Sequence, residues 1–217
     1  MDAFSCAACP RRCGALRKPA QPSGGFCGMP AGFVVARAAL HQWEEPCISG
    51  QHGSGTVFFS GCSLRCVYCQ NQQISLGRYG ALVTEENLLR MFDRLIEQGA
   101  HNLNLVNPTH YAPMLAKALK KYCSPVPVIY NSGGYERVEM LKALEGLVDI
   151  YLPDLKYVDS AVSLRYSGAA DYFDYASKAI LEMSRQVGKA TFDENGVMKK
   201  GLIVRHLILP RNTAQSI

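Results

Sequence analysis

The chain has 217 residues, of which 48% are hydrophobic and 19% charged, as in a globular domain and unlike a disordered chain. Its net charge of +5 is too small to indicate a nucleic-acid partner, and we do not expect one. No apolar run approaches the ~20 residues of a membrane helix, and the N-terminus carries no signal peptide pattern. We therefore expect a cytoplasmic protein without a membrane partner.

Composition divides the chain into two parts, residues 1–55 and 56–217. The first is rich in Cys, Gly, Pro and Arg and predicts only short extended pieces, at 32–37 and 41–44. In the second, runs typical of strands alternate with helical patterns. The expected strands are 56–60, 102–106, 126–130, 148–152 and 202–209, and the expected helices are 84–99, 111–122, 136–144 and 172–187.

Local signals mark the ends of several of these elements. Thr84 suits a helix N-cap, Gly99 and Gly188 suit helix ends, and residues 193–196 form a turn signal. Strands that alternate with helices predict a parallel sheet of βαβ units. Since a closed eight-stranded barrel needs about 250 residues, we expect an α/β fold in which a partial (β/α) barrel is truncated after its fifth strand.

Cysteine is the informative residue type, with nine in the chain and eight of them in the first 69 residues. This is too sparse for a disulfide scaffold, so clustered cysteines indicate metal or catalytic sites. Cys62, Cys66 and Cys69 follow the first strand of the parallel part in a C-x3-C-x2-C pattern. Three thiolates from one loop can hold three irons of a 4Fe–4S cluster and leave the fourth open to a small molecule. The alternatives are a structural zinc site and buried free thiols.

A second group of cysteines lies in the N-terminal part, at Cys6, Cys9, Cys13 and Cys27. Four cysteines with a C-x2-C start and a glycine-rich return can bind zinc or a second iron–sulfur cluster. The alternative is a disordered tail with free thiols.

The triad after the first strand resembles the signature of the radical S-adenosylmethionine (SAM) enzymes. More narrowly, residues 44–50, 53–62 and 66–71 are similar to the PflX-like group of pyruvate formate-lyase activating enzymes. The resemblance implies an oxidoreductase with a 4Fe–4S cluster on Cys62, Cys66 and Cys69, whose free iron binds SAM. It further implies reductive cleavage of SAM to a 5′-deoxyadenosyl radical that takes a hydrogen from a glycine of a partner glycyl-radical enzyme. A flavodoxin or ferredoxin would supply the electron.

The resemblance also places SAM-binding residues. It implies that Tyr68 lies near the adenine and that Lys156, of the Asp154-Leu-Lys156 motif, meets the SAM carboxylate. Asn107 stands where activating enzymes usually carry a Gly-Gly-Glu motif for the SAM amine, so the amine ligand is either Asn107 or a backbone carbonyl. The residues themselves add three further candidates: Asn131 and Ser132 can bond hydroxyls, and Arg205 is expected to face the barrel interior.

Two other functions stay open at this point. One is a radical SAM enzyme that acts on a small molecule, RNA or another protein. The other is an iron–sulfur electron carrier or a zinc-binding module without catalysis. A carrier should ligate every iron with cysteine and does not need five βα units, which favours the enzyme.

Overall fold

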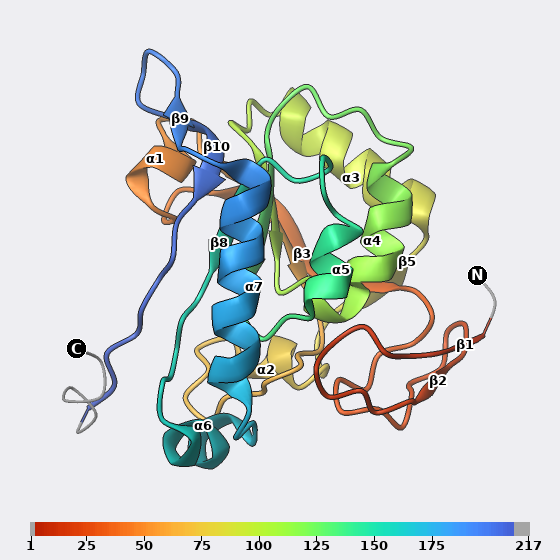
Figure 1. Cartoon of the computed structure of the whole chain (residues 1–217). Helices are drawn as coiled ribbons and strands as arrows, with labels where there is room; N and C mark the ends of the chain where they lie inside the picture. The colour runs from red at the N-terminus through yellow and green to blue at the C-terminus, as the bar shows by residue number, and fades with distance from the viewer. Residues whose placement is uncertain (1–2, 211–217) are drawn as a thin grey trace.

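A central, mostly parallel sheet organises the chain in the computed structural model, which describes residues 3–210 (Figure 1). Within those residues, eight strands form this sheet in the order β5-β3-β4-β6-β7-β8-β10-β9, and β1 and β2 form a separate antiparallel ribbon. The strands are β1 Phe4–Ser5, β2 Leu16–Arg17, β3 Phe33–His41, β4 Ser54–Phe59, β5 Ala81–Val83, β6 Leu103–Val106, β7 Val128–Ser132, β8 Ile150–Pro153, β9 Thr191–Phe192 and β10 Met198–Leu202.

The helices fall between these strands. They are α1 Pro46–Ser49, α2 Gln72–Ser75, α3 Glu85–Glu97, the 3-10 turn η1 Thr109–Tyr111, α4 Ala112–Leu119, α5 Val138–Lys142, α6 Ser160–Ser167 and α7 Tyr172–Val187. Thr84 caps α3 as expected, since its hydroxyl accepts a hydrogen bond from the Asn87 amide at 3.1 Å. No helix within residues 3–210 is long and apolar enough to cross a membrane.

Strands β4, β6, β7, β8 and β10 run parallel, which confirms the predicted α/β class and parallel sheet. Antiparallel strands extend this parallel part at both ends. On one side β3 pairs with β4 and β5, and on the other β9 pairs with β10. The predicted turn at 193–196 lies between β9 and β10.

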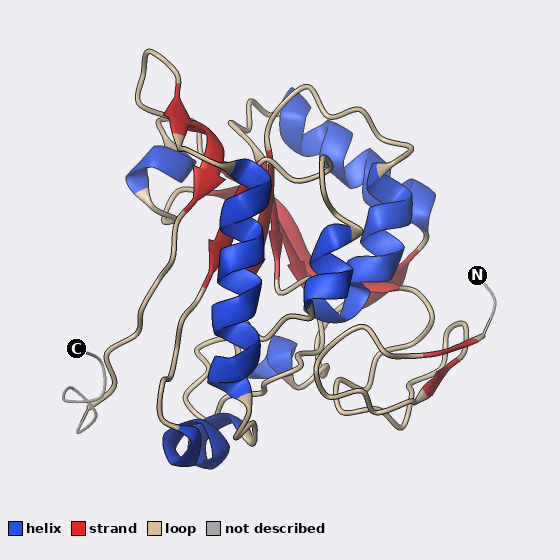
Figure 2. Ribbon diagram, in the orientation of Figure 1, coloured by secondary structure: helices blue, strands red, loops and turns tan. Residues whose placement is uncertain are grey.

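The two faces of the sheet are covered differently. Helices α3, α4, α5 and α7 lie on one face (Figure 2), where Val128 and Tyr130 of β7 join the main core. Because side chains alternate along a strand, Ile129 points to the opposite face. There it packs in a small cluster with Ile48 of α1, which is fully buried. Helix α1 thus covers the second face near the amino ends of the parallel strands.

Several predicted boundaries are wrong. The fifth parallel strand was expected over 202–209, but β10 ends at Leu202, and beyond it Arg205 makes a single bridge to Asp154. Pairing with β8 begins at Gly201, and the β-branched run after it leaves Ile208 exposed. The helix expected from residue 136 begins at Val138, because Glu136 is fully buried and receives hydrogen bonds from Thr109 and Tyr130.

The N-terminal part also contributes to the main sheet. The extended pieces expected at 32–37 and 41–44 are one nine-residue strand, β3. It pairs along the whole of β4, from Val35 opposite Phe59 to His41 opposite Ser54. Helix α6 and strand β5 carry no strong periodicity and were not expected.

Candidate active site

A cavity of about 970 Å³ opens at the carboxyl ends of the parallel strands. This edge is where α/β proteins bind ligands, because the loops after successive parallel strands meet there. Every residue of the predicted cluster and SAM sites lines it: Cys62, Cys66, Tyr68, Cys69, Asn107, Asn131, Ser132, Asp154, Lys156 and Arg205. The structure therefore brings together, in one cavity, residues at or after the carboxyl ends of five parallel strands, β4, β6, β7, β8 and β10.

The loop that carries the triad turns sharply after β4. Gly61 has a φ of +79°, and a Cβ there would lie 2.5 Å from Met29 Cγ, so only glycine fits. Two thiols of the loop accept hydrogen bonds. The Leu64 amide donates to Cys62 Sγ at 3.3 Å, and the Ser167 hydroxyl donates to Cys66 Sγ at 2.9 Å. Such donors stabilise negative charge on sulfur, as the ligands of an iron–sulfur cluster require.

The donor set fits an iron–sulfur cluster. Burial raises the pKa of Cys62 to about 11, against its backbone hydrogen bonds, so this thiol stays protonated until a metal core replaces its proton. Across residues 3–210, no three Cys, His, Asp or Glu side chains converge as a single metal ion would require. A four-iron cluster needs no such convergence, because each thiolate binds a different iron.

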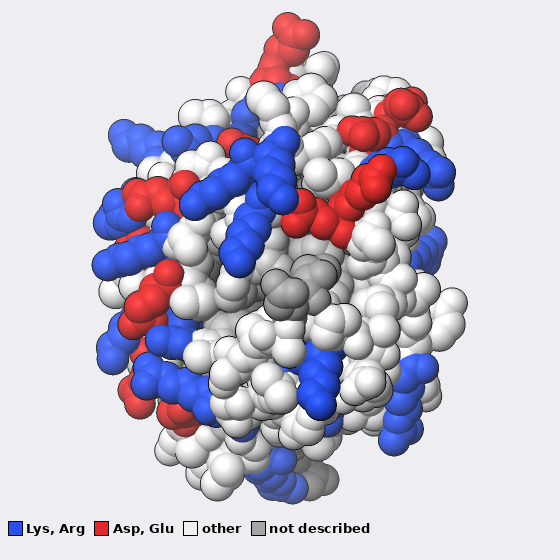
Figure 3. Space-filling view, turned by 90° about the vertical axis from the view of Figure 1, so that its right-hand side faces the viewer, with Lys and Arg blue, Asp and Glu red and all other residues white. Residues whose placement is uncertain are grey.

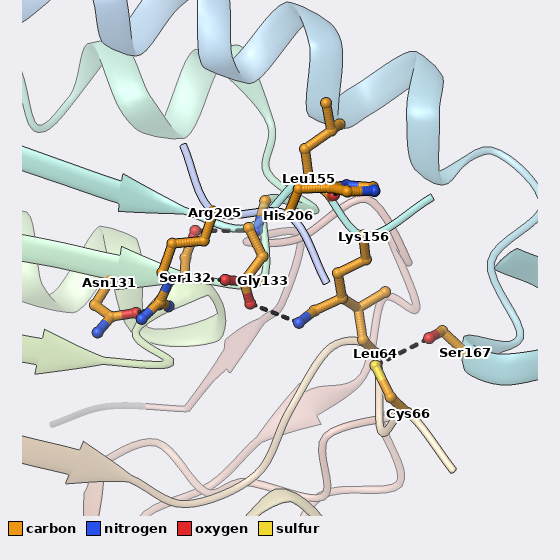
Figure 4. Close-up of polar contacts among 12 residues, drawn as sticks. Leu64, Cys66, Asn131, Ser132, Gly133, Leu155, Lys156, Ser167, Arg205 and His206 are labelled. Atoms are coloured by element: carbon orange, nitrogen blue, oxygen red, sulfur yellow. Dashed lines mark hydrogen bonds and ion pairs between the residues drawn. The ribbon is translucent and has the colours of Figure 1, made fainter. Parts of the chain in front are cut away.

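A chain of charged contacts forms one wall of the cavity (Figure 4). Lys156 Nζ lies 2.5 Å from Asp154 Oδ2, and Arg205 Nε lies 2.9 Å from Asp154 Oδ1. Arg205 Nη2 also donates to Asn131 Oδ1 at 2.6 Å. Burial opposes the charge on Lys156, but the neighbouring Asp154 and the thiols of Cys66 and Cys62 raise its pKa overall. Lys156 is therefore a fixed cation beside the triad.

Two acids reach the same arginine from the N-terminal part. Arg205 Nη1 lies 3.5 Å from Glu44 Oε2 and 3.8 Å from Glu45 Oε1. Burial raises the pKa of Glu44, while Arg205 lowers it. Glu44 lines the cavity, and sequence reasoning missed it as a site residue because no local pattern links it to Arg205, 161 positions away.

Tyr68 and Asn107 are both held by hydrogen bonds. The Tyr68 hydroxyl lies 2.5 Å from the Tyr157 hydroxyl, which in turn lies 2.7 Å from Ser167 Oγ, the donor to Cys66. Asn107, at a φ of +60°, donates its side-chain amide to the Gly61 carbonyl. That bond ties the end of β6 to the triad loop. Sequence reasoning missed Tyr157 and Ser167, which lie far from the triad along the chain.

The N-terminal cysteines lie next to this site. Cys6, Cys9 and Cys27 are buried and Cys13 is exposed. Burial raises the pKa of Cys9 to about 12, although a backbone hydrogen bond lowers it. A Cβ on Gly61 would lie 2.9 Å from the Cys27 carbonyl oxygen, so the two cysteine groups belong to adjoining loops.

Comparison with known proteins shows the family to which this chain belongs. Residues 56–199 match the radical SAM superfamily. The chain belongs to that superfamily. A 4Fe–4S cluster and SAM are the cofactors that a radical SAM domain implies, and Cys62, Cys66 and Cys69 are the residues here that would hold the cluster.

The chain is also 28% identical over 216 residues to an uncharacterized protein of Methanocaldococcus jannaschii. The alignment covers 96% of this chain and 58% of that relative, so the chain spans a little more than half of the relative's length. The relative's name states no activity, so membership of the pyruvate formate-lyase activating group stays a prediction.

The surface charges are mixed on the face that Figure 3 shows. Lys and Arg side chains lie among Asp and Glu and are separated by uncharged surface. This is the pattern of an ordinary solvated surface.

Proposed function

We propose that this chain is a radical SAM enzyme that cleaves SAM reductively and activates a partner glycyl-radical enzyme by taking a hydrogen atom from a glycine. The observation that carries the proposal is the meeting of the three triad thiols with Lys156 and Asp154 in one cavity. A bound cluster and SAM would supply the electron and the 5′-deoxyadenosyl radical.

The chain's own residues would bind and orient these groups. Cys62, Cys66 and Cys69 would ligate three irons, and the Ser167 hydroxyl would stabilise the charge on Cys66 Sγ. The Lys156 ammonium, held by Asp154, would pair with the SAM carboxylate as a point charge. The buried floor of the cavity would exclude water from the reactive carbon.

The cavity rim supports a protein substrate. Trp43 lines the cavity and leaves 86% of its surface exposed, and Leu207 at the same cavity is 45% exposed. Exposed aromatic and aliphatic side chains around a cavity are typical of surfaces that dock another protein. A partner could place a glycine-bearing loop there, and a flavodoxin or ferredoxin would deliver the electron.

The first experiment tests SAM cleavage. The chain is reconstituted anaerobically with iron and sulfide and reduced with dithionite, and 5′-deoxyadenosine and methionine are measured. We expect both products from the native chain and none from Cys62→Ala. Cys123→Ala is the matched control, because Cys123 is an exposed cysteine outside the cavity. A cluster whose EPR signal does not respond to SAM would refute the enzyme and favour an electron carrier.

The second experiment tests the substrate. The reconstituted chain is mixed with SAM and candidate glycyl-radical enzymes, and the EPR doublet of a glycyl radical is sought. SAM cleavage without this doublet, for every partner tried, would contradict activation and point to a small molecule, RNA or another protein as substrate.

A further inference from the structure

A buried arginine lies among the N-terminal cysteines without a full set of partners. Arg17 of β2 is only 1% exposed, and among the described residues its guanidinium donates a single hydrogen bond, from Nη2 to Cys27 Sγ at 3.3 Å. Within residues 3–210, its Nε and Nη1 have no hydrogen-bond partner. The rings of Phe4 and Tyr111 lie 5.9 Å from its Cζ. Because a guanidinium is always charged, this burial requires a nearby anion.

The fold of the N-terminal segment gathers thiols around this arginine. Phe4 pairs with Arg17 in the β1–β2 ribbon, so Cys6 follows the strand beside Arg17. The Cys6 amide donates to the Ala15 carbonyl at 3.0 Å, which brings Cys6 to the turn after Cys13. A Cβ on Gly25 would lie 3.1 Å from Cys13 Sγ, so the loop before Cys27 also reaches that turn.

We infer that Cys6, Cys9, Cys13 and Cys27 bind a doubly positive metal core, either a 4Fe–4S cluster or a zinc ion. Four thiolates around such a core leave a net negative charge. That charge supplies the anion that Arg17 lacks. This site lies outside the SAM cavity, and no part of the proposed SAM reaction is needed for it.

The four thiols do not yet converge on a single point in the part of the chain that the structure describes. A four-iron core spreads its ligands over four irons, so it needs less loop movement than one zinc ion does. Cys13 is the exposed thiol of the four and precedes Gly14, whose φ is +62°, so less packing holds it in place than holds the three buried thiols.

The site adjoins the triad loop, so metal binding there would stabilise the position of that loop. Arg11, two residues after Cys9, donates from Nε to the Ser63 carbonyl at 2.8 Å and from Nη2 to the Ser167 carbonyl at 2.7 Å. The guanidinium of Arg11 also lies 4.0 Å from the centre of the Phe26 ring, beside Cys27. The centre would therefore hold Arg11 against the loop that carries Cys62 and Cys66.

The test removes the triad and asks whether metal still binds. The full chain carrying Cys62→Ala, Cys66→Ala and Cys69→Ala is reconstituted anaerobically with iron and sulfide, and separately with zinc. We expect one bound core per chain. Bound sulfide together with visible absorbance would identify an iron–sulfur cluster, and bound metal without either would identify zinc. Adding Cys27→Ser should abolish binding, whereas Cys47→Ser, a half-buried cysteine outside the group, should not. A folded triple variant that binds neither metal would refute the inference.

A second measurement uses the unmodified chain, so it does not depend on how the variant folds. Metal-loaded and chelator-treated samples are alkylated and the labelled cysteines located by mass spectrometry. We expect the four N-terminal cysteines to be protected only when metal is present, while Cys123 reacts in both samples. Equal labelling of the four in both samples overturns the proposal.

The role of Arg17 has its own readout. Arg17→Met should speed chelator removal of the metal by at least about tenfold, a loss equal to one charge-assisted hydrogen bond. Arg17→Lys keeps the positive charge and should restore slow release. Equal release from all three proteins would show that Arg17 is not the partner of the centre.

Discussion

Tyr172 offers a sharp test of how the cavity wall is built. Its side chain is fully buried at the start of α7. The hydroxyl accepts a hydrogen bond from the Lys156 amide at 2.9 Å and lies 2.7 Å from the Asp154 carbonyl and 2.9 Å from that of Gly133. One oxygen thus joins the loop after β7 to the loop after β8, and the second of these loops carries Lys156.

The change Tyr172→Phe keeps the ring and removes only this oxygen. It leaves a buried amide without a partner, which costs about 1–3 kcal/mol, and it removes hydrogen bonds to carbonyls worth about 1 kcal/mol more. We therefore expect the free energy of unfolding to fall by about 2–4 kcal/mol, measured by anaerobic urea denaturation of the metal-free chain. We also expect weaker SAM binding after reconstitution, because Lys156 loses its anchor.

The control for this prediction is Tyr175→Phe on the same helix, since the half-buried Tyr175 packs its ring edge-on against Tyr135. We expect the control to change stability by less than about 0.5 kcal/mol. If Tyr172→Phe changed it equally little, the hydroxyl would not tie the two loops together and the reasoning would fail.

Three further changes probe the cation, a buried acid and the covered face of the sheet. Lys156→Ala should raise the KM for SAM about 10- to 100-fold in the cleavage assay, as expected for one lost charge-assisted hydrogen bond. An unchanged KM would show that Lys156 does not bind SAM. Burial raises the pKa of Glu136 from 4.5 to about 7, so the folded state binds the carboxyl proton more tightly than the unfolded state does. The free energy of unfolding should therefore fall by about 3 kcal/mol as the pH rises from 4.5 to about 7. Glu136→Gln should abolish that fall, and urea denaturation at about pH 5 and about pH 8 checks it; a fall that persists would contradict it. Ile48→Ala should lower the free energy of unfolding by about 2–5 kcal/mol through the cavity it leaves, while Leu181→Ala, 71% exposed, should change little; equal effects would show that α1 does not hold the second face.

Local patterns in the sequence predicted the parallel part of the fold well. The capped helix α3 carries a helical periodicity, and the buried strands β4, β6, β7 and β8 lie within short β-rich runs, so short windows suffice to find them. The family resemblance predicted Lys156, and Asn131 was expected from its place at the end of a strand. Asn131 lies near the end of β7 and Lys156 follows β8, and the carboxyl ends of parallel strands meet at one edge of the sheet whatever lies between them in sequence.

The parts of the fold and of the site that were not predicted depend on contacts between segments that lie far apart in the sequence, and no short window contains both segments. Strand β3 is fixed by antiparallel pairing to β4 across the turn that holds α1, and its own sequence has weak alternation. Glu44 becomes a cavity residue only because Arg205 folds back beside it. Arg17 looked like an ordinary basic residue, and among the Lys and Arg side chains of residues 3–210 it is the one that is buried.

The pairing of β3 with both β4 and β5 bears on how the protein can be shortened for study. A fragment trimmed to the matched region, residues 56–199, would leave the main-chain amides and carbonyls along one side of β4 facing solvent. Bare strand edges of this kind invite other chains to add on, so the trimmed fragment would self-associate. We therefore expect a shortened chain to need residues 33–41 to cover the edge of β4.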